Sequence, residues 1–166
     1  MDPRYPTGKF AHDAHLTPEK RREMIAMIGS FPAELKAAMA TAQLDSPYRE
    51  GGWTARQVVH HVADSHMNAF VRFRLALTED TPTVKPYAEA KWAELVDSTT
   101  EDPSASIQIL EGLHRRWHRM LEGMSDADFA RTMHHPERGT ITCEWLLQLY
   151  AWHGRHHVGH VKLTAR

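Results

Sequence analysis

Histidines near the end of the chain are the residues with the clearest potential for chemistry. His153, His156, His157 and His160 fall within eight residues of a segment that we expect to be helical. Residues four apart on a helix lie on the same face, one turn above the other, and neutral imidazole is the commonest metal ligand in proteins. The spacing therefore offers two pairs that could bind one ion, His153 with His157 and His156 with His160.

The helical phase favours His153 with His157. At about 100° per residue, four polar residues gather on one side of this helix, which we predict to be its exposed side: Glu144, Gln148, Arg155 and Lys162. Leu146 lies on the opposite side, and His153 and His157 flank its direction. His160 and especially His156 lie further round, so we expect His156 to point away from the favoured pair.

The other histidines raise the question of a third ligand. Helical bundles place metal sites between facing helices, and the helix expected from about residue 54 to 77 contains His60, His61 and His66. His60 points nearly opposite the apolar face, whereas His66 lies within that face and His61 at its edge. Periodicity alone leaves His61 and His66 as alternatives. His114 and His118 are also four apart, but arginines surround them, so we interpret them as a partly solvated pair.

Helix signals dominate the elements that must position these residues. Thr17-Pro18 is a typical helix start for a helix reaching about Gln43, and Pro32 should kink or split it. Further helices are expected over 54–77, 86–96, from 103 onward, briefly after 125 and from 142 almost to 166, with a polar loop at 134–139 and an extended hint at 139–142. The pattern predicts an all-α fold, a four-helix bundle with short extra helices. We find no repeat or linker, so residues 1–166 should form a single domain.

Composition narrows the class of protein. The chain has 166 residues, of which 42% are hydrophobic and 25% charged, and its formal net charge is −1. No basic face is indicated, which argues against nucleic acid and anionic membrane as partners. No apolar run of about 18 residues and no leader sequence is visible. The single cysteine, Cys143, fits a reducing compartment, and we expect a cytoplasmic protein.

Three segments carry a resemblance to a known family. They are residues 5–10 (YPTGKF), residues 51–68 (GGWTARQVVHHVADSHMN) and residues 150–160 (YAWHGRHHVGH). Together they resemble the DinB-like superfamily, and within it the YfiT-type branch of metal-dependent hydrolases, to which the bacillithiol S-transferases are related. The resemblance extends over nearly the whole chain, and its middle motif is long and specific.

The resemblance implies a four-helix bundle, often homodimeric, that holds one divalent ion, zinc or nickel, through three histidines. Carried over to this sequence, the ligands are His61 on the second long helix and His153 and His157 on the last. The family thus selects His61 over His66 and agrees with the pair that the helical phase favours. Many relatives have glutamine at the position of His160, so we expect His160 at most to contact a metal-binding histidine and not to bind the ion itself.

A site of three imidazoles suggests two reactions on a small-molecule substrate. Three protein ligands leave a coordination position open, as in catalytic sites, and a cation there lowers the pKa of water to about 7 or deprotonates a thiol. The protein is then either a metal-dependent hydrolase or a thiol S-transferase in which a low-molecular-weight thiol attacks an electrophile. The last helix offers no inward carboxylate as a base, since Glu144 is on the predicted exposed side. That absence disfavours a zinc peptidase and tilts the choice slightly toward thiol transfer.

Two further hypotheses concern the surroundings of the ligands. Asp64, three residues after His61, could orient a ligand or accept a proton, although a surface salt bridge explains it equally well. A non-catalytic metal-binding or stress-associated protein would keep the three ligands but have no cleft beside them. A cleft lined by the loop near Gly51 and by the loop at 134–139 would instead favour an enzyme.

Overall fold

Side-chain caps set where three of the long helices begin. Thr17 and Thr142 each accept a hydrogen bond from the backbone N–H three residues on, and Thr54 and Gln57 form a reciprocal capping box. The computed structural model describes residues 2–165. In chain order its elements are α1 (Pro18–Met39), α2 (Ala55–Thr78), α3 (Glu89–Trp92), α4 (Val96–Thr100), α5 (Ser104–Glu122), α6 (Asp126–Phe129), β1 (Thr132–His135), β2 (Gly139–Thr142) and α7 (Cys143–Lys162).

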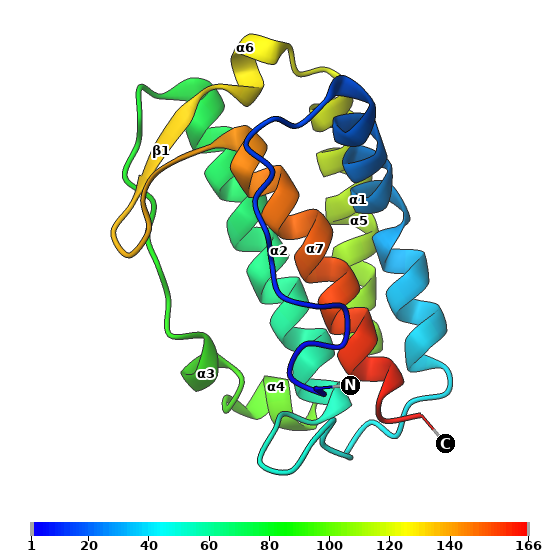
Figure 1. Cartoon of the computed structure of the whole chain (residues 1–166). Coiled ribbons are helices and arrows are strands. Elements are labelled where there is room, and N and C mark those ends of the chain that lie inside the picture. The colour runs from blue at the N-terminus through cyan, green and yellow to red at the C-terminus, as the bar shows by residue number, and fades with distance from the viewer. Residues whose placement is uncertain (1, 166) are drawn as a thin grey trace.

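The four long helices pack side by side as a bundle (Figure 1), in which α1 and α2 each contact both α5 and α7. The predicted all-α four-helix bundle is therefore confirmed. Its buried apolar residues form two clusters, one around Phe73 and Trp117 and the other around Leu35 and Leu110. Each long helix passes from one cluster to the other over a few residues: 28–31 in α1, 63–69 in α2, 110–117 in α5 and 150–158 in α7.

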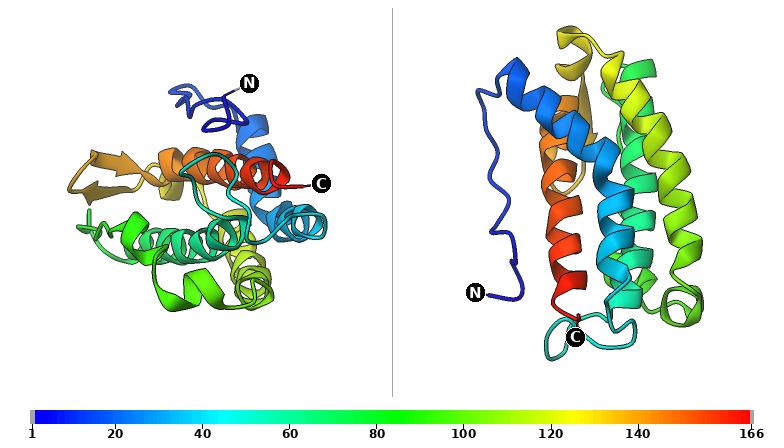
Figure 2. Two further views of the ribbon diagram at one scale, coloured as in Figure 1. Left: turned by 90° about the horizontal axis from the view of Figure 1, so that it is seen from below. Right: turned by 90° about the vertical axis from the view of Figure 1, so that its right-hand side faces the viewer.

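Several local predictions need correction. Helix α1 ends at Met39 rather than near Gln43, and Pro32 does not split it; Figure 2 shows the helix changing direction part-way along its length. The single short helix expected over 86–96 is replaced by α3 and α4. The loop expected at 134–139 begins too early, because residues 132–135 form strand β1, which pairs antiparallel with β2. Burial alternates along β1, and Met133 is fully buried.

The N-terminal segment, residues 2–16, lies along α7 without regular secondary structure (Figure 1). The amide of Gln148 donates to the Asp13 carbonyl (3.0 Å) and accepts from the Asp13 N–H (2.8 Å), and Trp152 Nε1 donates to the Gly8 carbonyl (3.0 Å). Gln148 is only 3% exposed. Its predicted place on an exposed side is wrong, because helical periodicity carries no information about a segment that covers the helix from outside.

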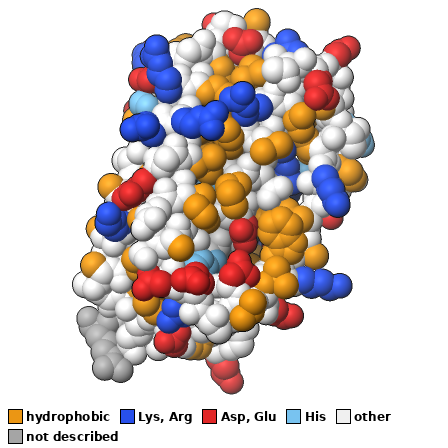
Figure 3. All heavy atoms as spheres, turned by 180° about the vertical axis from the view of Figure 1, so that it is seen from behind, with side chains coloured by type: hydrophobic (Ala, Val, Ile, Leu, Met, Phe, Trp, Pro, Cys, Tyr) orange, Lys and Arg blue, Asp and Glu red, His pale blue; other side chains and the backbone are white. Residues whose placement is uncertain are grey.

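The surface mixes charges and hydrophobic side chains. Figure 3 shows one face on which basic, acidic and hydrophobic groups alternate. Val71, Leu95, Val96 and Ile109 are among the large hydrophobic residues exposed over more than two fifths of their area. Among the helices of residues 2–165, none combines the length and hydrophobicity needed to cross a membrane. The homodimer that the family resemblance implies stays a prediction.

Replacing Gly154 by alanine should destabilise the bundle. A Cβ there would lie 2.7 Å from Cδ2 of Phe31, a buried ring of α1, so α7 and α1 would have to move apart or the ring would have to turn. Overpacking of this kind costs about 1–3 kcal/mol. We expect Gly154→Ala to lower the midpoint of urea unfolding.

Gly112→Ala is the matched control. Nothing lies within 4 Å of a Cβ at this helical position of α5, and alanine is about 1 kcal/mol better than glycine in a helix interior. The control should therefore raise the midpoint. A Gly154→Ala protein as stable as the wild type would show that α1 and α7 do not need this close approach.

Candidate metal centre

His61, His153 and His157 converge between α2 and α7. One ring nitrogen of each lies within 4.8 Å of one nitrogen of both others. The ring centroid of His61 is 5.5 Å from that of His153 and 4.9 Å from that of His157, and the centroids of the two rings on α7 are 4.4 Å apart. The structure thus brings together the three residues predicted as ligands.

The three rings suit a divalent ion chemically. Burial lowers the pKa of His61 to about 4, and it holds the pKa values of His153 and His157 well below the usual value, with the neighbouring imidazoles adding to the effect. The rings are therefore neutral at physiological pH, which is the form that binds metals. Zinc sits about 2.0–2.1 Å from a histidine nitrogen, so small adjustments of these side chains bring all three nitrogens within reach of one ion.

A second group of imidazoles adjoins the first. His156, His157 and His160 also bring ring nitrogens within 4.8 Å of one another. Nδ1 of His160 lies 3.2 Å from Nδ1 of His157, so His160 contacts a predicted ligand directly. His156 is 8% exposed and stacks on Trp152 with the ring centroids 4.4 Å apart, on the outer side of α7. It lies outside the group formed with His61.

His66, the alternative that periodicity left open, lies behind His153 rather than beside His61 and His157. Its Nε2 is 3.1 Å from Nδ1 of His153, and its Nδ1 is 2.8 Å from Nε2 of His114. His114 is 1% exposed because α1 covers it, so only one member of the pair interpreted as partly solvated is accessible. His118, in contrast, keeps a third of its side chain accessible, beside Glu122.

Two further candidates lie away from this centre. His60 is buried against α5, with Nδ1 2.7 Å from Oγ of Ser106, and belongs to neither histidine group. Asp64 is half-buried on α2, where burial raises the pKa of its carboxyl and the charge of Asp97 adds to the effect. It lies outside the pocket described next, and its proposed role stays a prediction.

A pocket of about 160 Å³ lies beside His153. Its charged lining is mixed: Arg72 from α2, Glu89 from the start of α3, and Glu137 and Arg138 from the turn of the hairpin. The hairpin turn therefore contributes to a cleft as expected, whereas the loop near Gly51 supplies none of the described lining residues. Burial raises the pKa of Glu89, which the two arginines partly offset. Sequence reasoning missed Glu89, because this residue lies on a short helix remote from the histidines.

Hydroxyl groups form the inner wall of this pocket. Tyr150 donates to the backbone carbonyl of Ser65 (3.2 Å), and its oxygen is 3.1 Å from Oγ of Ser65. The hydroxyl of Tyr87 is buried without a partner among the described residues, and burial raises its pKa. A buried hydroxyl without a partner is costly, so it is available to a bound ligand.

Comparison with known proteins places the chain in a family. The family model described as the DinB superfamily matches residues 33–161. The chain belongs to the DinB superfamily. A relative from Bacillus subtilis (strain 168), named "Putative metal-dependent hydrolase YfiT", is 46% identical over 166 residues, covering 98% of this chain and 93% of its own. The resemblance stated from the sequence is thereby confirmed.

Another relative and a solved structure show the same similarity in sequence and fold. A Bacillus mycoides (strain KBAB4) relative, also named a "putative metal-dependent hydrolase", is 48% identical over 96% of this chain and 94% of its own. The solved structure of Bacillus subtilis YfiT superposes with a TM-score of 0.93 at 45% identity, covering 97% of this chain and 94% of that one. It is described as a probable metal-dependent hydrolase with an unusual four-helix bundle topology.

Metal content should depend on His153 and His157 but not on His156. Each ligand replacement removes one of three nitrogens from a small-ion site, so His153→Ala and His157→Ala should bind less than the roughly one divalent ion per chain expected of the wild type. His156→Ala, a neighbouring buried histidine, should retain it. Elemental analysis of the purified proteins measures this. Loss of metal in His156→Ala together with its retention in His153→Ala would place the ion in the group of His156, His157 and His160 instead.

The metal-free protein should lose stability in mild acid partly through His114. Burial lowers the pKa of His114 to about 4, below its usual value of about 6.5, so the unfolded chain binds the proton more readily between these values. The contribution of the neutral His114 ring to the free energy of unfolding is complete above about pH 6.5 and is lost as the pH falls toward 4. Between about pH 7 and pH 5 this one group should cost about 2 kcal/mol.

Urea unfolding at both pH values measures the effect, with His114→Gln as the variant that cannot titrate there. The wild type should lose more stability on acidification than the variant does. Equal losses would mean that the His114 ring titrates normally in the folded protein.

Proposed function

We propose that this protein is a metal-dependent hydrolase of small molecules, with one divalent ion bound by His61, His153 and His157. The observation that carries the proposal is the mixed-charge pocket lined by His153, which is one of a group of three neutral imidazoles. Three imidazole ligands suit zinc and also nickel. When bound, such a cation supplies Lewis acidity and lowers the pKa of a small nucleophile coordinated at the open position.

The residues of the pocket bind and orient the substrate. Within residues 2–165 neither Arg72 nor Arg138 forms an ion pair, and Arg72 donates only to the backbone carbonyl of Lys85 (2.9 Å). Their charge is therefore available to an anionic group of the substrate. Tyr150 and Ser65 are held by their mutual hydrogen bond, and the Tyr87 hydroxyl donates to an acceptor on the substrate.

Glu89 is the group that we propose to accept the proton of the attacking water. Partial burial raises the pKa of its carboxyl, which makes the carboxylate a stronger base. The sequence favours thiol transfer only because the last helix offers no inward carboxylate. Glu89 reaches the pocket from α3 instead, and with this residue in place hydrolysis becomes the better supported reaction.

Thiol transfer remains the second candidate, for one specific reason. The pocket is small and carries two arginines, which suits a low-molecular-weight anionic thiol as a co-substrate. In that reaction the thiol sulfur would form a bond to an electrophilic carbon, and the leaving group on that carbon would depart. A bound metal ion would favour the thiolate form, so no protein base would be needed to remove the thiol proton. A non-catalytic metal-binding protein needs no such pocket, so the cleft argues against that alternative.

The substitution Glu89→Gln separates the two reactions. If the nucleophile is water, removing the base should lower the hydrolysis rate by about 10²-fold or more while metal content stays unchanged. The measurement is turnover of a panel of small amides and esters by the metal-loaded protein, in parallel with conjugation of bacillithiol, mycothiol or glutathione to a chlorinated dinitrobenzene. Glu94→Gln, an exposed neighbour, is the control and should be fully active.

Conjugation that proceeds equally well in the wild type and in Glu89→Gln, without hydrolysis of any panel member, would reverse the assignment in favour of the transferase. Absence of both activities in fully metal-loaded protein would favour the non-catalytic alternative.

A further inference from the structure

Pro32 leaves one backbone carbonyl of α1 without its helical partner. A proline has no N–H, so the carbonyl four residues earlier, that of Ile28, receives no hydrogen bond from the helix ladder. Pro32 and Ile28 are both buried. A buried carbonyl without a partner is costly, and its partner must come from outside the helix.

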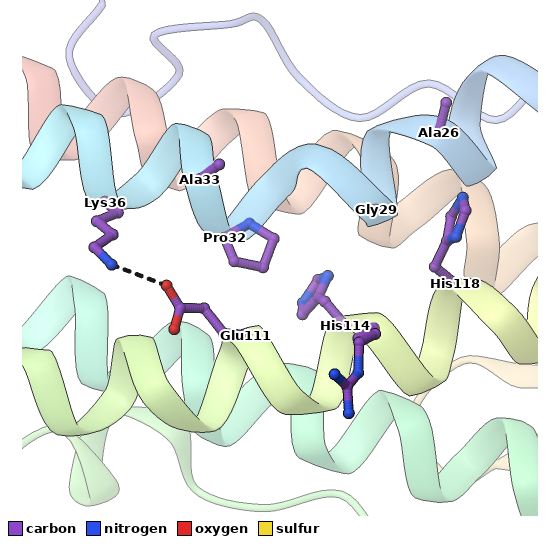
Figure 4. Close-up of a pocket in the computed structure, with 9 residues that line it drawn as sticks. Ala26, Gly29, Pro32, Ala33, Lys36, Glu111, His114 and His118 are labelled. Atoms are coloured by element: carbon purple, nitrogen blue, oxygen red, sulfur yellow. Dashed lines mark hydrogen bonds and ion pairs between the residues drawn. The ribbon is translucent and has the colours of Figure 1, made fainter.

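His114 supplies that partner. Its Nδ1 lies 2.6 Å from the Ile28 oxygen, and Figure 4 shows His114 reaching from α5 toward α1 beside Pro32. A carbonyl oxygen only accepts hydrogen bonds, so Nδ1 of the neutral His114 ring must carry the proton. Its Nε2 then has a free lone pair and can only accept.

The same reasoning passes from ring to ring. Nε2 of His114 accepts from Nδ1–H of His66, 2.8 Å away, which leaves Nε2 of His66 as an acceptor. That nitrogen accepts in turn from Nδ1–H of His153 at 3.1 Å. These tautomers are assigned from the hydrogen-bond network. The only ring nitrogen of His153 with a free lone pair is then Nε2, on the side away from His66.

We propose that His66 and His114 are positioning residues that hold His153 in the Nδ1–H tautomer, with its Nε2 lone pair free to bind the ion. The chain of three imidazoles is anchored by the carbonyl that Pro32 exposes. The inference rests on the proposed metal site. A ligand histidine whose other nitrogen donates to a fixed acceptor is held in one orientation and one tautomer.

The surroundings make this chain rigid and dry. The His66 ring is fully buried, with the ring centroids of Phe31, Tyr150 and Trp117 at 4.9, 5.2 and 5.8 Å. These aromatic rings pack around the His66 imidazole and hold it in place. The line of imidazoles ends at the Ile28 carbonyl oxygen, which has no proton to donate. The line therefore holds the tautomers in place and does not carry protons to the groove between α1 and α5 that Figure 4 shows.

Histidine tautomers can be measured directly in the metal-free protein by long-range ¹H–¹⁵N correlation spectroscopy, which separates protonated from unprotonated ring nitrogens. His153, His66 and His114 should each show a protonated Nδ1 and an unprotonated Nε2. A wild-type protein in which His153 carries its proton on Nε2 overturns the proposal, whatever the variants do.

Metal affinity tests the consequence. Loss of a residue that orients a ligand typically weakens metal binding about 10–100-fold, so His66→Leu and His114→Leu should bind zinc that much more weakly in a chelator competition. His114→Gln should retain most of the affinity, because its amide oxygen can accept from Nδ1–H of His66. A merely structural role for His114 would not give this rescue.

Ser106→Ala is the matched control. Ser106 is another buried polar residue of α5 that is hydrogen-bonded to a histidine of α2, His60, but it does not belong to the line of hydrogen-bonded imidazoles. Its zinc affinity should equal that of the wild type, and circular dichroism should show all variants folded. Wild-type affinity in a folded His114→Leu protein overturns the proposal. Neither measurement requires turnover, so an inactive protein with these tautomers and affinities would refute only the proposed hydrolase activity.

Discussion

Neutral imidazoles buried between two hydrophobic clusters impose the constraint on which this structure depends. Each ring has one donor and one acceptor, and leaving either without a partner in a dry interior costs free energy. His66, His114 and His153 satisfy one another in a line, and the line needs an acceptor at its end. The Ile28 carbonyl is that acceptor. A proline in the middle of α1, which usually weakens a helix, therefore completes the pairing of a layer that crosses the bundle.

The same layer explains why the helices approach one another so closely. Gly154 follows His153 directly, and its lack of a side chain lets the Phe31 ring pack against α7. Phe31 also lies over His66 and His114, with ring centroids 4.9 and 5.1 Å away. Packing and hydrogen bonding thus position the same three imidazoles, and His153 is presented to the other two predicted ligands from a rigid support.

The sequence predicted the features that depend on local periodicity. The helix starts at Thr17, Thr54 and Thr142 follow from capping chemistry, and the pairing of His153 with His157 follows from the helical repeat. The choice of His61 over His66 needed the family resemblance, because both residues lie on or near the apolar face of α2.

What the sequence did not predict comes from contacts between distant segments. His114 is buried by α1, and Gln148 is covered by residues 2–16. Glu89 enters the pocket from a helix of four residues. One overlooked signal was present: a proline inside a helix leaves a carbonyl four residues earlier in need of a donor, and a buried histidine on a facing helix is a suitable one.

The position of Ile28 has a consequence for how the gene can be divided. The segment shared with the family model begins at residue 33, after Ile28, Phe31 and Pro32 and about two thirds of the way along α1. A recombinant fragment trimmed to that boundary would keep His61, His153 and His157 while discarding the carbonyl that terminates the imidazole line and the ring that covers it. The boundary of the family model is therefore not a boundary of the cooperative folding unit.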